Sequence, residues 1–140
     1  MNAKYFIDTN IFVYAFDQSD KNKQHTANQL IQDAHIERKG CISYQVIQEF
    51  LNVATNKFKQ PLSISDCQRY LQSVLSPLCQ VFTSVDLYQY ALDIMQRWKY
   101  SFYDSLIIAA AIQANCGILY SEDMQHGQSV GSLTILDPFL

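Results

Sequence analysis

Two acidic positions in this sequence follow short apolar runs that resemble β-strands. Asp8 comes directly after Tyr5-Phe6-Ile7, and the pair Glu122-Asp123 comes after the run Ile118 to Ser121. In open α/β sheets, ligand sites gather at the carboxyl ends of the strands. We therefore expect Asp8 and one of the two late acids to face a common crevice. Only one is expected there because neighbouring side chains point in different directions.

Two further acids belong to predicted helices. Asp104 lies three residues after Ser101, the spacing of a helix cap, and precedes a helix that is apolar on every side and so should be buried. Glu49 lies between Ile47 and Phe50 in a second apolar helix, where an unpaired carboxylate is costly. Both acids therefore point to an environment that compensates their charge.

Each acid also has a purely structural interpretation. Asp8 suits a turn or a helix cap, and Asp104 suits a cap. The pair Glu122-Asp123 suits a solvated loop, and Glu49 can point outward beside Gln45. Taken one at a time, these alternatives stay open.

Taken together, the four acids favour a cation site. Packed carboxylates repel one another, and residues 100–140 contain no lysine or arginine to neutralise the late acids. Hard oxygen ligands select Mg²⁺ or Mn²⁺ rather than zinc, and carboxylate-held metal pairs recur in phosphodiester cleavage. The sequence therefore predicts a metal-dependent hydrolytic site at Asp8, Glu49, Asp104 and Asp123.

The elements that must position these acids alternate between short apolar strands and helices. This alternation predicts an α/β fold whose parallel central sheet is covered on both faces. With 140 residues, 49% of them hydrophobic, the chain is expected to form one domain over residues 1–140. We expect Gly40 to stop one helix, Ser43 to cap the next, Ser65 to open another and Pro77 to end it. The two helices around Pro61 have no strand between them, which indicates a small helical projection.

Other classes of protein are disfavoured. No run is long enough to span a membrane, and Met1-Asn2-Ala3-Lys4 does not resemble a signal peptide, so we expect a cytoplasmic protein. The four cysteines have no metal-site spacing and are interpreted as reduced core thiols. His126 is interpreted as a loop residue, and no Ser/His/Asp triad or glycine-rich phosphate loop is present.

Three segments and the Glu49 helix together resemble a known family, the PIN domain, and within it the toxin nuclease of VapBC-type toxin–antitoxin pairs. The segments are Phe6-Ile7-Asp8-Thr9-Asn10-Ile11-Phe12, Phe102-Tyr103-Asp104-Ser105-Leu106-Ile107 and Ser121-Glu122-Asp123-Met124. The resemblance covers essentially the whole chain. Each motif alone is weak, whereas their order and spacing together are specific.

The resemblance implies a Rossmann-like three-layer α/β/α sandwich and Mg²⁺- or Mn²⁺-dependent endoribonuclease activity. It also implies dimerisation, and inhibition by an antitoxin protein whose basic residue enters the acidic groove. The four acids match the family's acidic quartet, and the polar residues around it match Thr9, Asn10 and Ser121. RNA phosphates would then be held elsewhere, by residues drawn from Lys21, Lys23, Arg38, Lys39, Lys57, Lys59, Arg97 and Lys99.

Two other functions compete with an RNA-cutting toxin. A phosphatase would use Asp8 as nucleophile, but that chemistry usually wants a second acid two residues on, where Asn10 stands. It would also want a lysine near the late acids. A non-catalytic module would use the acids as a docking groove for a basic partner.

Overall fold

We analysed a computed structural model that describes residues 3–140. Met1 and Asn2 lie outside the described residues. They belong to the predicted domain 1–140 and to the N-terminal segment that we expect not to be a signal peptide. Between residues 3 and 140, no helix has the length and apolar character needed to cross a membrane.

A six-stranded sheet forms the centre of the fold, with strand order β3-β2-β1-β4-β6-β5. All strand pairs are parallel except β5 with β6. In chain order the strands are β1 (Tyr5–Ile7), β2 (Gly40–Ser43), β3 (Cys79–Val81), β4 (Ile118–Tyr120), β5 (Ser129–Val130) and β6 (Leu133–Leu136). The chain adds β2 and β3 on one side of β1 and then crosses to place β4 on the other. The β1/β4 boundary is therefore the topological switch point, where α/β sheets open a ligand crevice.

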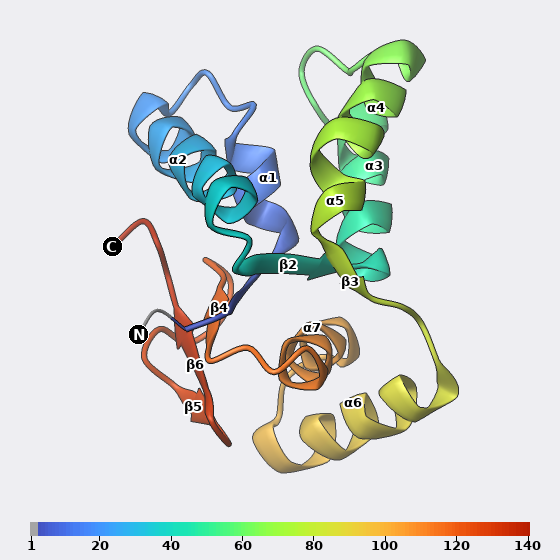
Figure 1. The fold of residues 1–140 in the computed structure, drawn as a ribbon, viewed down its shortest axis with the longest axis vertical. Coiled ribbons are helices and arrows are strands. Elements are labelled where there is room, and N and C mark those ends of the chain that lie inside the picture. Colours follow the sequence, from blue (N-terminus) through green and yellow to red (C-terminus); the bar gives the residue numbers. More distant parts are fainter. Residues whose placement is uncertain (1–2) are drawn as a thin grey trace.

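Helices cover both faces of the sheet. Figure 1 shows α1 (Thr9–Tyr14) and α2 (Lys21–Glu37) on one side, with α6 (Val85–Trp98) and α7 (Phe102–Gln113) on the other. This arrangement confirms the predicted three-layer α/β/α sandwich. The parallel-sheet prediction is confirmed except at its edge, where the two-residue strand β5 pairs antiparallel with β6. A strand this short leaves no alternating pattern for a sequence to display.

Helix α7 forms the buried centre of its layer. Ser101 begins it, because its hydroxyl accepts a hydrogen bond from the Asp104 N–H at 3.2 Å. Every residue from 105 to 111 is buried, so this part of the helix has no side that faces solvent. The capping interpretation of Asp104 is therefore correct, and the same cap places this acid at the end of a buried helix.

A helical projection stands beside the sandwich, as predicted. It consists of α3 (Tyr44–Asn56) and a continuous run of α4 (Ile64–Tyr70), the π-helical turn η1 (Leu71–Leu75) and α5 (Ser76–Leu78). Figure 1 shows these helices running side by side. Phe16, in the turn just after α1, packs between Phe50 and Tyr70, with ring centroids 5.7 and 5.1 Å away. This aromatic contact fixes α3, and with it Glu49, against α1.

Three predicted helix boundaries are wrong. Ser63, not Ser65, caps α4, and the helix runs through Pro77 because the π turn before it already interrupts the regular hydrogen-bond ladder. Ser43 does occupy the cap position of α3, as predicted, although its hydroxyl makes no capping bond. Helix α2 ends at Arg38, which takes a left-handed conformation with φ of 58°, before Gly40 is reached.

Gly40 has a packing role instead. A Cβ at this position would lie 2.4 Å from the Ala34 Cβ and 2.9 Å from the Tyr5 Cε2, far inside van der Waals contact. The absent side chain lets α2 press against β1 and β2 at the centre of the sheet.

Replacing this glycine tests that packing. We expect Gly40→Ala to lower the free energy of unfolding by about 1–3 kcal/mol, the usual range for overpacking a filled core. Urea denaturation measures the loss. Gly131→Ala, at a site with no atom within 4 Å, serves as the sterically open control, although its φ of 61° adds backbone strain. An unchanged urea midpoint for Gly40→Ala would contradict the proposed contact.

Candidate functional site

The site begins with Asp8 at the carboxyl end of the central strand β1. Its N–H donates to the Tyr120 carbonyl at 3.0 Å, so the residue continues the ladder between β1 and β4. Its side chain turns inward and is only 6% exposed. Ser121, which follows β4, donates its buried hydroxyl to Asp8 Oδ2 at 2.8 Å. The ends of the two strands at the switch point are thus joined through one carboxylate.

Thr9 connects Asp8 to the helical projection. Its N–H donates to Asp8 Oδ1 at 2.7 Å, which makes Asp8 the cap of α1, as its structural interpretation proposed. Its hydroxyl donates to Glu49 Oε1 at 2.6 Å. Glu49 therefore points toward Asp8 and not away from the protein.

Gln45 connects the same carboxylate to α7. Its amide nitrogen lies 3.3 Å from Glu49 Oε2 and 3.1 Å from the Tyr103 carbonyl, one residue before Asp104. Gln45 is buried, although its helical spacing from Glu49 suggested a shared outward face. One side chain therefore sets the distance between the Glu49 and Asp104 segments.

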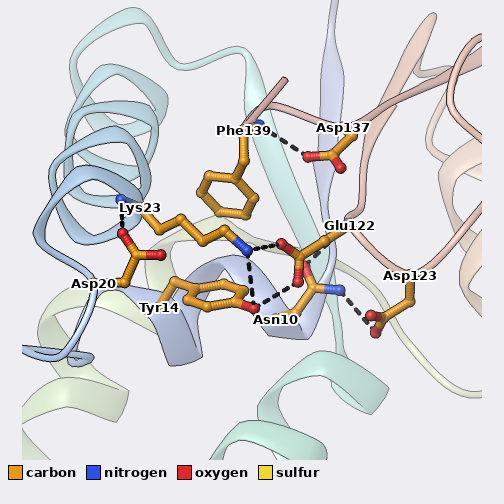
Figure 2. Close-up of polar contacts among 8 residues, drawn as sticks. All are labelled: Asn10, Tyr14, Asp20, Lys23, Glu122, Asp123, Asp137 and Phe139. Carbon is orange, nitrogen blue, oxygen red and sulfur yellow. Dashed lines mark hydrogen bonds and ion pairs between the residues drawn. The ribbon is translucent and has the colours of Figure 1, made fainter.

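Asp123 lies on the loop after β4, where Asn10 donates its amide to Asp123 Oδ2 at 2.9 Å. Figure 2 shows the two adjacent late acids diverging, with Asp123 on Asn10 and Glu122 on Tyr14 and Lys23. The prediction that only one of the pair faces the shared site agrees with this divergence. Lys23, one of the candidate RNA contacts, is ion-paired with Glu122.

The pKa values of Asp8 and Asp104 show that the acids of the site interact electrostatically. The pKa of Asp8 is raised to about 7, first by burial and then by the nearby charges of Glu49 and Asp104, against the hydrogen bonds from Ser121 and Thr9. The pKa of Asp104 is raised first by burial and then by Asp123 and Glu49, against the bond with Ser101. The structure thus brings all four predicted acids into one interacting cluster.

The donor set fits a hard divalent cation. All four groups are carboxylates, and among residues 3–140 each oxygen of Asp8 accepts one hydrogen bond, which leaves it a lone pair for a metal. Within the described part of the chain, no three acidic, histidine or cysteine side chains are close enough to hold an ion as they stand. Closing around a metal therefore requires some of these side chains to rotate toward a common point.

The roles of three residues in this site were not predicted from the sequence, those of Tyr14, Gln45 and Lys23. Tyr14 shares a face with Asn10 because residues 9–14 form the helix α1. The spacing of Gln45 and Glu49 was visible as a signal. No sequence pattern joins Lys23 to Glu122, because they meet only through the tertiary fold.

The architecture and the acidic cluster define an α/β protein with a carboxylate site at its switch point. Comparison with known families is more specific. The chain belongs to the PIN domain family, whose model matches residues 5–128. A search of curated proteins gave no significant match.

Solved structures with the same fold come from toxin–antitoxin systems. A toxin–antitoxin complex from Klebsiella pneumoniae has a chain 18% identical, with TM-score 0.67 and coverage of 96% of this chain and 97% of that one. For VapBC2 from Rickettsia felis, bound to a promoter DNA fragment, the values are 22%, 0.61, 94% and 96%. For Mycobacterium tuberculosis VapC20, described as a Sarcin-Ricin loop cleaving toxin, they are 19%, 0.61, 85% and 89%. At these identities the similarity is one of fold.

The raised pKa of Asp8 predicts how stability changes with pH in metal-free protein. Because the folded state holds this proton more tightly than the unfolded chain, the stabilisation is complete below about pH 4 and is lost as the pH rises through about 7. Asp8→Asn removes the titration. We expect the variant to be more stable than wild type at pH 7.5 and to lose that advantage toward pH 4. The gap grows by about 1.4 kcal/mol for each pH unit.

Urea denaturation in the presence of a chelator, from pH 4 to 7.5, measures this difference. Asp93→Asn, which removes an exposed carboxylate on α6, is the matched control and should track the wild type across the range. Parallel pH profiles for Asp8→Asn and wild type would show that Asp8 titrates normally.

Proposed function

We propose that this protein is a metal-dependent endoribonuclease and the toxin of a type II toxin–antitoxin pair. The observation that carries the proposal is the convergence of four like charges, from Asp8, Glu49, Asp104 and Asp123, at the switch point of a PIN domain. A cluster of like charges around the buried Asp8 opposes folding, so its presence is best explained by a bound cation and the reaction it supports.

Mg²⁺ or Mn²⁺ would be held by Asp8 and Asp104 together with Glu49 and Asp123. When bound, the metal would supply an activated water and offset the charge that develops on the scissile phosphate. An RNA substrate is supported by family membership and by the resemblance to VapC20, which is described as cleaving the sarcin–ricin loop.

The supporting polar residues would keep the carboxylates in place during this chemistry. Thr9 restrains both Asp8 and Glu49, and Ser121 restrains the second oxygen of Asp8. Such outer hydrogen bonds orient metal ligands and tune their affinity. Asn10 does the same for Asp123. A phosphatase would want an acid at position 10, whereas the residue there is an amide that donates a hydrogen bond to Asp123, which disfavours that alternative.

Removing one carboxylate tests the assignment. Asp8→Asn and Asp104→Asn should each lower RNA cleavage by at least about a hundredfold, the scale on which loss of a charge-stabilising group slows a reaction. Cleavage of total RNA, with Mg²⁺ or with chelator, measures the effect, and circular dichroism confirms folding.

Asp93→Asn controls for the same change of charge on the surface and should cleave at the wild-type rate. Activity in either Asp8→Asn or Asp104→Asn comparable to wild type would rule out the proposed site. Wild-type protein that cleaves equally well in chelator would rule out the metal dependence.

An antitoxin is the proposed protein partner. Its basic residue would enter the acidic cluster, where arginine is favoured because its guanidinium pairs with carboxylates and stays charged. Its apolar residues have a suitable surface on the helical projection, where a groove of about 540 Å³ is lined by Tyr44, Ile47, Leu71 and Phe82 among others. A homodimer of the toxin belongs to the same proposal.

Competition between Mg²⁺ and an antitoxin peptide tests this partner. A peptide with one arginine should inhibit cleavage, and added Mg²⁺ should reduce that inhibition. Changing the arginine to alanine should weaken inhibition most at low Mg²⁺. If the alanine peptide inhibits equally at every Mg²⁺ concentration, the peptide does not act through the carboxylates.

A further inference from the structure

Asp123 differs from the other three acids of the site in how it is held. Asp8 caps a helix, Asp104 lies in the first turn of another, and Glu49 lies within a third, so regular backbone fixes all three. Asp123 is exposed and belongs to a loop between β4 and β5. The one hydrogen bond to its side chain within residues 3–140 comes from Asn10. Its position therefore depends on what orients Asn10 and the loop.

The neighbouring residue Glu122 provides that restraint. Its N–H reaches the Asn10 side-chain oxygen at 3.5 Å, so the Asn10 amide bridges consecutive residues of the loop. Its carboxylate accepts a hydrogen bond from the Tyr14 hydroxyl at 2.6 Å and pairs with the Lys23 ammonium. Figure 2 shows Lys23 and Tyr14 converging on Glu122 from α2 and α1.

Lys23 is itself fixed more firmly than an ordinary surface lysine. Its N–H donates to the cap residue Asp20 at 3.1 Å, and its ammonium lies 4.6 Å from the Tyr14 ring centroid and 5.4 Å from that of Phe139. The paired side chains of Lys23 and Glu122 are only 31% and 22% exposed. Restricted solvent and two aromatic neighbours make this pair stronger than exposed pairs, which contribute little.

We propose that Lys23 and Tyr14 are positioning residues for the site: by holding Glu122, they fix the loop that carries Asp123 and keep the Asn10 amide directed at it. The effect of these residues on metal binding rests on the proposed metal-dependent function. The contacts of Lys23 and Tyr14 with Glu122, which we call the clamp, are present without metal. The pairing also neutralises Glu122, which would otherwise add a fifth negative charge beside the four carboxylates.

Whether a substitution strengthens or weakens Mn²⁺ binding distinguishes a positioning role of Lys23 from a simple effect of its charge. Lys23→Met removes a positive charge near the acids, so electrostatics alone would strengthen Mn²⁺ binding. Loss of positioning would weaken it. Tyr14→Phe removes a bond to Glu122 with no change of charge, so positioning alone predicts weaker binding there as well.

We expect both Lys23→Met and Tyr14→Phe to weaken Mn²⁺ binding, measured by calorimetry, by up to about tenfold, the lower end of the effect of outer-shell changes. In metal-free protein, amide hydrogen exchange should quicken in residues 121–124 and stay unchanged in β1. Lys23→Arg should restore most of both properties. Lys21→Met is the matched control, because Lys21 is an exposed lysine in the same helical turn, and it should leave both unchanged.

Unchanged exchange in the 121–124 segment of both variants would overturn the proposal, as would tighter Mn²⁺ binding by Lys23→Met. A wild-type protein that binds no Mn²⁺ would refute the metal site but not the clamp, which the metal-free exchange then decides alone. Failure of the clamp with intact wild-type Mn²⁺ binding would leave the nuclease proposal standing.

Discussion

The structure is organised around a carboxylate that is buried beside like charges. Asp8 is almost fully buried, and burial raises its pKa more than the neighbouring charges do. The elements around it end or begin on its hydrogen bonds: α1 starts on its cap, the segment after β4 reaches it through Ser121, and Thr9 extends the connection to α3. These bonds offset part of the desolvation cost, and burial still dominates. The region is therefore held in a state that favours a proton or a cation.

This site places the stability of the fold in opposition to the grouping of like charges. Hydrogen bonds from Thr9 and Ser121 favour the charged form of Asp8, whereas the apolar surroundings of β1 favour the neutral form. The apolar helix α7 supplies the compact packing that lets Asp104 approach, and Gly40 lets α2 approach on the opposite face. Stability is thus provided by the core on both sides of the sheet, while the acids at its edge reduce it. This is the usual relation between stability and function in sites built from like charges.

The sequence predicted the layered fold and the grouping of the acids because both depend on local patterns. Strand ends at Asp8 and Ser121, and the cap at Ser101, follow from short-range spacing. Glu49 was ambiguous because a helix has two sides, and only its packing through Phe50 shows which side faces Asp8. Lys23 with Glu122 was beyond prediction, since residues 99 positions apart in sequence meet only after α2 has docked. The two-residue strand β5 was missed because it is too short to show alternation.

The sheet order also sets when the site exists during synthesis. Asp8 meets Ser121, and Asn10 meets Asp123, across 113 positions of sequence, because β4 is inserted next to β1 only after the intervening helices are made. Contacts this distant form late and slowly, and a chain emerging from the ribosome folds from its N-terminal end. While the ribosome still holds the last third of the chain, Asp8 has no strand β4 beside it and Glu49 has no partner acids in α7. Under the proposed function, the protein stays inert next to the messenger and ribosomal RNA that produce it until its own translation is nearly complete.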